Sequence, residues 1–349
     1  MDVLIFDMDG VLVDVSGSYR KTIQKTVSLY LALCLGFSQG KETPVTQEEI
    51  SLFKAAGGFN NDWDLTAGVL LYLISISGLP KRQTLKRFSS MDETLSFLKK
   101  ETKARRLSRE NLLERKDIPA FTNKIRSAGG GLSGIRKVLG SSWDGWLYGS
   151  GDLNGENLVK RIFQEVYLGR RFRGCYGLER RFYRGRGFYL YEKLLIPRSM
   201  FATLRKRFWM GIASGRPRYE AELALRRFRL TSYFQRVVTL DECLEEEERL
   251  FHLTGRRFRR TKPHPYPLLR VIEASEFPKP RCAYVGDVVD DMKTAKRAEV
   301  ELPIVAVGFL PGKHDDPQMK QALFRAGAQR VVTGPAELFE TIMSLDLQT

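Results

Sequence analysis

Two aspartates two residues apart, Asp7 and Asp9, follow the apolar run of residues 3–6 and precede Gly10. Side chains at this spacing point to the same side of an extended chain, so the two carboxylates need a cation or a shared proton to coexist. A bound Mg²⁺ meets that need. An Asp-rich turn after a strand has the same pattern without any chemistry, so the interpretation depends on the rest of the chain.

Other polar groups follow or precede apolar runs further along the chain. They are Ser214 and Gly215 after residues 208–213, Lys262 just before a helical pattern, and Asp287, Asp290 and Asp291 after residues 281–286. Clustered acids bind Mg²⁺, whereas a hydroxyl, backbone amides and a lysine hold a phosphoryl group. Taken singly, each has a structural alternative: Ser214 as a helix cap, Lys262 as a surface charge, and Asp291 as a first-turn acid.

Strand-like and helix-like segments alternate around these groups. The expected strands are residues 3–6, 208–213, 237–238, 281–286, 302–307 and 330–332. Such alternation indicates parallel pairing, and it predicts an α/β fold with a doubly wound parallel sheet. Ligands bind at the carboxyl ends of the strands in such sheets, which is where the polar groups stand.

The segment between residues 15 and 196 does not continue this alternation. Helical patterns occupy residues 19–35 and 156–168, and a capping box at Thr46 to Glu49 predicts another helix. The apolar run of residues 65–79 is too short for a membrane span and predicts a buried helix. We therefore expect a catalytic core of residues 1–14 and 197–349, interrupted by a mainly α-helical domain of residues 15–196.

The composition is strongly basic, with a net charge of +16 and a pI near 9.7. This balance favours an anionic substrate or a nucleic-acid partner, and residues 170–186 interleave arginine with aromatic residues and glycine. Four scattered cysteines and three histidines show no zinc or disulfide spacing. No basic and then apolar leader opens the sequence, so we expect no signal peptide, no membrane association and a cytoplasmic location.

Four motifs in this order resemble those of the haloacid dehalogenase superfamily of phosphohydrolases. They are Asp7-Met8-Asp9-Gly10-Val11, Ser214 after a strand, Lys262-Pro263, and Gly286-Asp287-Val288-Val289-Asp290-Asp291. The resemblance covers the core and is to members of subfamily I, similar to type IA, with a helical cap between the first and second motifs. It implies a Rossmann-like core, an enlarged cap and Mg²⁺ as cofactor.

The resemblance also implies roles for individual residues. Asp7 is similar to the nucleophile that forms an aspartyl-phosphate, and Asp9 to the general acid and base. The metal ligands implied are Asp7, Asp9 through its carbonyl, Asp287 and Asp291, with Asp290 as an alternative to Asp291. The implied phosphate-binding groups are Ser214, Gly215 and Lys262.

The inserted segment is longer than the cap usual in this superfamily. Residues 57–63, with Ser214-Gly215-Arg216-Pro217, are similar to a small subgroup of uncharacterised cap-bearing hydrolases. This similarity predicts substrate contacts for Asn60, Asn61, Trp63 and Arg216. A polar loop with an Asx cap is the structural alternative for the amide cluster.

The predicted function is a Mg²⁺-dependent phosphatase of a small phosphorylated metabolite. An acid at Asp9 disfavours halide displacement and ATP hydrolysis, because family members with those activities resemble this chain but lack that acid. A phosphosugar mutase with the same core chemistry is one alternative, and a nucleic-acid-binding protein that uses the basic cap is another. Neither the identity of the substrate nor the oligomeric state follows from the sequence.

Overall fold

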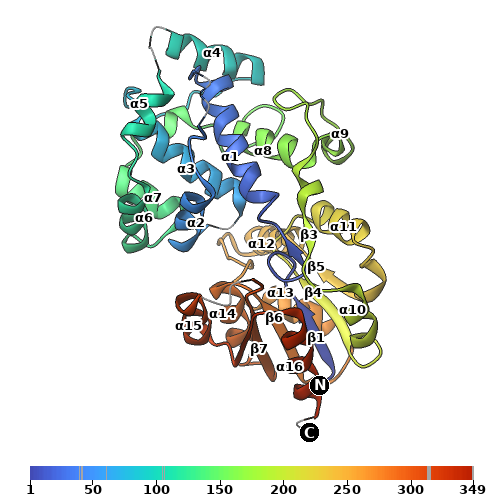
Figure 1. Ribbon diagram of the computed structural model, residues 1–349. Coiled ribbons are helices and arrows are strands. Elements are labelled where there is room, and N and C mark those ends of the chain that lie inside the picture. Colours follow the sequence, from blue (N-terminus) through green and yellow to red (C-terminus); the bar gives the residue numbers. More distant parts are fainter. Residues whose placement is uncertain are drawn as a thin grey trace. The chain divides into compact units, whose positions relative to one another are not determined.

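The structure is a computed structural model that describes residues 1–38, 40, 42–59, 61–103, 105, 107–312 and 316–347. It divides into two compact units (Figure 1). The core unit consists of Met1–Val15 and Glu192–Thr349, and the inserted unit is Ser16–Tyr191. The core range and inserted range expected from the sequence, 1–14 with 197–349 and 15–196, differ from these by a few residues.

A six-stranded sheet forms the centre of the core unit, with strand order β5-β4-β1-β6-β7-β8. Every pairing in it is parallel. The predicted α/β fold with a doubly wound parallel sheet is therefore confirmed. The strands are β1 (Val3–Phe6), β4 (Trp209–Ala213), β5 (Arg236–Val238), β6 (Cys282–Gly286), β7 (Ile304–Phe309) and β8 (Arg330–Val332).

The helices of the core unit cover both faces of this sheet. Successive residues of a strand point to opposite faces, so each strand contributes side chains to both layers. Leu4 and Phe6 pack on one face with helices α10, α11 and α16, while Val3 and Ile5 pack on the other with α13, α14 and α15. The core helices are α10 (Arg198–Leu204), α11 (Arg218–Arg227), α12 (Leu240–Thr254), α13 (Tyr266–Glu273), α14 (Val289–Ala298), α15 (Pro317–Ala326) and α16 (Pro335–Leu347), with a 3₁₀ turn at Thr231–Tyr233.

A short antiparallel ribbon lies where the chain leaves and re-enters the core unit. It is formed by β2 (Val13–Asp14) and β3 (Lys193–Leu194), and Val13 is paired with Leu194. The sequence does not predict this ribbon, because two residues per strand are too few for a recognisable alternation.

The inserted unit is helical, as predicted. Helix α1 packs against α3 and α8, and α3 packs against α7. Residues 65–74 of α3 are buried, which matches the predicted buried helix, and no helix among the described residues is long and apolar enough to span a membrane. The helices are α1 (Tyr19–Leu29), α2 (Gln47–Ala55), α3 (Asp62–Ile76), α4 (Met91–Lys103), α5 (Arg109–Glu114), α6 (Ile118–Ser127), α7 (Gly131–Leu139), α8 (Leu158–Leu168) and α9 (Arg171–Tyr176), with a π-helical turn at Tyr30–Cys34 and 3₁₀ turns at Asp144–Trp146 and Phe188–Tyr191.

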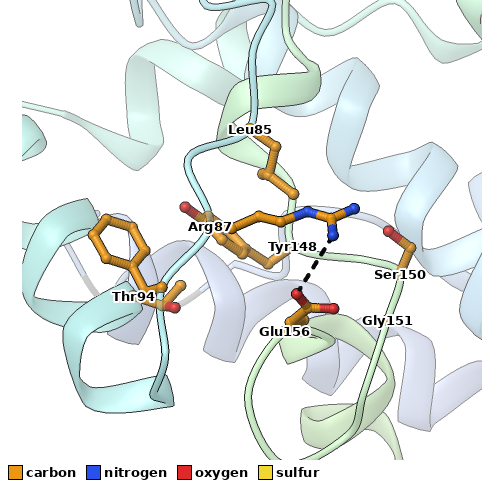
Figure 2. A pocket seen from close by; sticks show the side chains of 8 residues that line it. Leu85, Arg87, Thr94, Tyr148, Ser150, Gly151 and Glu156 are labelled. Carbon is orange, nitrogen blue, oxygen red and sulfur yellow. Dashed lines mark ion pairs between the residues drawn. The ribbon is translucent and has the colours of Figure 1, made fainter.

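The inserted unit has an open surface depression beside Asn123, Lys124, Ser127 and Ala128, and one small pocket that is more enclosed (Figure 2). Its volume is about 50 Å³, well below the size that holds an organic ligand. The ion pair between Arg87 and Glu156, 4.0 Å apart, lies across it. We therefore place the candidate site elsewhere.

Candidate active site

Asp7 stands at the carboxyl end of β1, in the middle of the sheet. The backbone N–H of Asp7 donates to the carbonyl of Val285 at 2.8 Å, which continues the pairing between β1 and β6. From β1 the chain passes to β4 and β5 on one side, and then crosses to β6, β7 and β8 on the other. Asp7 therefore lies at the switch point of a doubly wound sheet, the usual ligand position.

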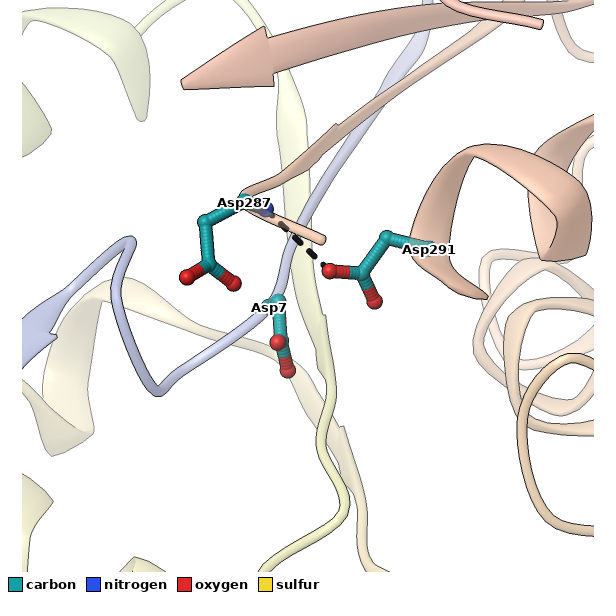
Figure 3. Close-up of side chains that lie close together, drawn as sticks. All are labelled: Asp7, Asp287 and Asp291. Carbon is teal, nitrogen blue, oxygen red and sulfur yellow. Dashed lines mark hydrogen bonds between the residues drawn. The ribbon is translucent and has the colours of Figure 1, made fainter. Parts of the chain in front are cut away.

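Three carboxylates meet at this point (Figure 3). One oxygen each of Asp7, Asp287 and Asp291 lies within 4.8 Å of the others, and Asp7 and Asp291 are buried. Asp287 directly follows β6, and Asp291 lies in the first turn of α14. Asp290, the alternative to Asp291 left open by the sequence, is not part of this cluster.

Hydrogen bonds fix the position of the Asp291 carboxylate. Its Oδ2 accepts the backbone N–H groups of Asp287 at 3.1 Å and Val288 at 3.2 Å. Its Oδ1 accepts the Tyr284 hydroxyl at 2.8 Å and the Lys262 ammonium at 2.8 Å. Lys262 also contacts Asp7 Oδ1 at 2.8 Å, so the ammonium joins two of the three acids.

The charge balance of the cluster favours a cation. Burial, and then the neighbouring Asp291 and Asp9, raise the pKa of Asp7 to about 7 even though Lys262 acts in the opposite direction. Burial opposes the charge of Lys262, but Asp291 and Asp7 outweigh it and raise the pKa of this amine above its ordinary value. Three carboxylates against one ammonium leave two negative charges, and oxygen ligands of this kind suit Mg²⁺.

Gly10 allows the cluster to close. Its φ is +77°, and a Cβ atom built there would lie 2.0 Å from Asp287 Oδ2. Both the backbone conformation and the close approach exclude a side chain. The turn at Asp9-Gly10 thus places Asp287 against the chain that follows Asp7.

Ser214 and Gly215 follow β4, the strand next to β1, so they stand at the same edge of the sheet as Asp7. Ser214 is buried, its backbone N–H donates to the Val238 carbonyl at 2.9 Å, and its Oγ accepts the backbone N–H of Arg216 at 3.1 Å. Gly215 is exposed, and a Cβ there would meet no atom within 4 Å. The turn therefore presents an open backbone segment beside the acids.

Arg216 is predicted to contact the substrate, and the structure places its guanidinium between two carboxylates. Its Nε donates to Asp9 Oδ1 at 2.5 Å, and its Nη2 and Nη1 donate to Glu192 Oε1 and Oε2 at 3.1 and 3.5 Å. The side chains of Arg216 and Glu192 are each 1% exposed, against 32% for Asp9. Sequence reasoning misses Glu192, because no motif or spacing marks it.

The predicted substrate contacts of the inserted unit have structural roles in the described chain. Asn61 is the N-cap of α3, and its side chain accepts the backbone N–H of Asp64 at 2.8 Å, as the Asx-cap alternative predicts. The Trp63 ring packs edge-on against Phe163, and the Lys160 ammonium lies 4.6 Å from its centroid. Asn60 lies outside the described residues. Substrate contact by these residues stays a prediction.

Known proteins resemble the chain in both sequence and fold. Residues 197–305 match the family described as haloacid dehalogenase-like hydrolase. An imidazoleglycerol-phosphate dehydratase from Phytophthora nicotianae is 36% identical over 95 residues, which are 27% of this chain and only 18% of that protein.

Two solved structures share the fold at low sequence identity. A structural-genomics target solved by X-ray crystallography superposes with a TM-score of 0.59 at 18% identity and covers 99% of both chains. A phosphatase from Thermococcus thioreducens superposes with a TM-score of 0.52 at 20% identity, over 92% of this chain and 99% of that one. The family match and the shared fold together confirm the resemblance to haloacid dehalogenase-like hydrolases.

Proposed function

We propose that this chain is a Mg²⁺-dependent phosphohydrolase that acts on a small phosphorylated metabolite through an aspartyl-phosphate. One observation carries the proposal. Asp7, at the end of the central strand, has a lysine whose side chain is 13% exposed 2.8 Å from its Oδ1, and two further carboxylates within 4.8 Å. A nucleophile, a cation site and a positive group for phosphoryl oxygens thus meet at one point.

The chain's own groups divide the reaction into two displacements. In the first, an Asp7 oxygen attacks phosphorus, the bond to the leaving oxygen breaks, and Asp9 donates a proton to that oxygen. In the second, water attacks phosphorus, Asp9 takes its proton, and the bond to Asp7 breaks to release phosphate. Lys262 and the Ser214 turn would hold the phosphoryl oxygens. Mg²⁺ held by Asp7, the Asp9 carbonyl, Asp287 and Asp291 would supply positive charge that offsets the approach of an anion.

Phosphate release from a panel of phosphorylated metabolites, with and without Mg²⁺, tests this function. The panel should include sugar phosphates and imidazoleglycerol phosphate, the compound named in the partly matching relative. Asp7→Asn should lower turnover by about 10³-fold or more, because it removes the nucleophile. Asp290→Asn is the matched control. Asp290 is the sequence neighbour of Asp291 but lies outside the cluster, so this variant should keep near-normal turnover.

Two results would contradict the proposal. If a folded Asp7→Asn variant keeps its turnover, Asp7 is not the nucleophile. If phosphate release is unchanged when a chelator removes Mg²⁺, the reaction does not require the cation. A mutase with the same chemistry would consume a sugar phosphate, yield an isomeric phosphate and release little free phosphate. Product identification on the same samples separates the two activities.

A second candidate function, nucleic-acid binding by the inserted unit, is favoured by the position of the charge. The inserted unit has 30 Lys and Arg against 16 Asp and Glu, a net charge of +14, whereas the core unit has 27 against 25, a net charge of +2. A basic domain joined to a nearly neutral enzyme core fits a polyanionic partner. Phe172 of the Arg-rich tract is buried, so charge rather than stacking on this ring would supply the affinity.

A further inference from the structure

We propose that Arg216 and Glu192 are positioning residues that hold the carboxylate of Asp9 in the orientation required for proton transfer. This inference rests on the proposed function, in which Asp9 exchanges protons with the leaving oxygen and the attacking water. It assigns to Arg216 a role other than the substrate contact predicted from the sequence. It also gives a role to Glu192, which lies in none of the motifs.

The geometry of the guanidinium carries the assignment. All three of its nitrogens make contacts with carboxylates, Nε with Asp9 and both terminal nitrogens with Glu192. A planar group that is bidentate on one acid cannot rotate without breaking those bonds, so the direction of its Nε–H is fixed by Glu192. Glu192 therefore determines where Arg216 holds Asp9.

Contacts on both sides keep this pair in place. The backbone N–H of Arg216 donates to Ser214 Oγ at 3.1 Å, which ties the arginine to the turn after β4. The carbonyl of Glu192 accepts Nη1 of Arg227 in α11 at 2.8 Å. Arg216 and Glu192 are buried, whereas Asp9 is partly exposed. The buried ion pair therefore supports one carboxylate, that of Asp9, which is accessible to a substrate.

Substrate binding by Arg216 fits this arrangement poorly. An incoming phosphate would have to displace Asp9 or Glu192 from a guanidinium whose side chain is 1% exposed, and displacing Glu192 would break an ion pair between two buried groups. Lys262, 2.8 Å from Asp7 Oδ1, already supplies a positive group beside the proposed nucleophile.

The test compares two kinds of phosphate monoester. An aryl ester such as p-nitrophenyl phosphate has a good leaving group and needs little protonation, whereas an alkyl ester such as glycerol phosphate depends on the acid. Arg216→Lys keeps the charge but loses the bidentate geometry. Both esters form the same aspartyl-phosphate, so the comparison uses kcat/KM, which reports the first displacement and not the shared hydrolysis. We expect Arg216→Lys to lower kcat/KM for the alkyl ester about 10–100-fold and for the aryl ester about threefold or less.

Other outcomes would overturn the assignment. An equal fall of kcat/KM for both esters that comes from a raised KM would make Arg216 a substrate contact. An equal fall of kcat/KM that follows the folded fraction would make the pair purely structural. Arg218→Lys is the matched control: Arg218 lies two residues further on, is half exposed and pairs with Glu245, so neither ester should be affected. If Arg216→Lys fails to fold, Glu192→Gln replaces it, with the same pattern expected at about 3–10-fold.

A double substitution separates failure of this inference from failure of the proposed function. On an Asp9→Asn background the acid is already lost, so Arg216→Lys should have no further effect on the alkyl ester. A further loss of tenfold or more would contradict the positioning role. Failure of the proposed function would give a different result. The unmodified protein would then release no phosphate from either ester, or Asp7→Asn would not reduce the release.

Discussion

Asp7 is a buried acid whose surroundings oppose its charge. Its pKa rises from 3.8 to about 7 on folding, first through burial and then through Asp291 and Asp9, despite Lys262. A carboxyl with a raised pKa binds its proton more tightly when folded, so the metal-free protein loses stability as the pH rises from about 4 to about 7. Above pH 7 this loss is complete, and a bound cation would offset it.

Asp7→Asn should therefore stabilise the metal-free protein above pH 7. Removing the opposed charge is expected to raise the free energy of unfolding by on the order of 1–3 kcal/mol at pH 8, with a much smaller effect at pH 4.5, where the acid is protonated in the folded state. Thermal unfolding in a chelator at both pH values measures this. A lower melting temperature for the variant at pH 8 would contradict it, and added Mg²⁺ should narrow the gap by stabilising the unmodified protein.

The groups of the site differ in how far the sequence predicts them. Asp7, Asp287, Asp291 and Lys262 meet in the structure, and each stands directly after a predicted strand or at the start of a predicted helix. Tyr284 lies inside a strand, and strand periodicity does not show that its hydroxyl contacts Asp291. Glu192 lies 24 residues from Arg216 in sequence, and only the folded chain brings the two together.

Helix α8 orders the Arg-rich tract that follows it. The fully buried Glu165 accepts the backbone N–H groups of Arg181, Phe182 and Tyr183 at 2.7–3.0 Å, and the Arg161 Nε at 2.8 Å. The tract resembles an RGG-like segment in composition alone, and the structure shows residues 181–183 folded around one acid. The sequence does not reveal this, because a glutamate on a helix is normally exposed.

Glu165→Gln should destabilise the inserted unit strongly, since it leaves Arg161 buried without an opposite charge. We expect a loss of about 3–5 kcal/mol and faster proteolytic cleavage between residues 177 and 187. Glu179→Gln removes an acid from an exposed ion pair with Arg173 and should cost about 1 kcal/mol or less. Similar melting temperatures and cleavage rates for the two variants would contradict the structural role of Glu165.

Helix α12 makes a contact near the site that the charge pattern does not predict. The acidic and then basic stretch of residues 245–260 is mostly exposed, and its acidic half is part of a helix that begins at a capping box of Thr239 and Glu242. Glu247 accepts the backbone N–H groups of Arg260 at 2.6 Å and Thr261 at 3.2 Å. The helix thus positions the loop that leads to Lys262, a contact that charge patterning alone does not predict.

Over the complete chain, the basic charge is divided unequally between the two units, which predicts a separable electrostatic function. Replacing four of the exposed arginines of the 170–186 tract with Glu should weaken binding to single-stranded nucleic acid and reduce its salt dependence. The four positions are Arg170, Arg171, Arg184 and Arg186. Binding should fall by about 10-fold or more at low salt, measured by fluorescence anisotropy across a salt series.

A matched control tests whether the position of the charge matters. Four exposed cations of the core unit, Arg205, Lys206, Lys279 and Lys320, give the same change of net charge when replaced with Glu. If both sets weaken binding equally, the effect is one of net charge. If the unmodified protein binds nucleic acid with no salt dependence, or not at all, the second candidate function is excluded.

The parallel sheet also has a consequence for biosynthesis. Val3 of the central strand pairs with Trp209 on one side and Cys282 on the other, so ribosomes add about 200 residues before the first neighbour exists and about 280 before the second. At about 5–20 residues per second, the fully apolar segment Val3–Phe6 waits for tens of seconds without its native partners. The inserted unit emerges during that interval and makes its contacts within itself. The strand that precedes Asp7 completes its pairing late, and until then its unpaired apolar edge needs protection from aggregation.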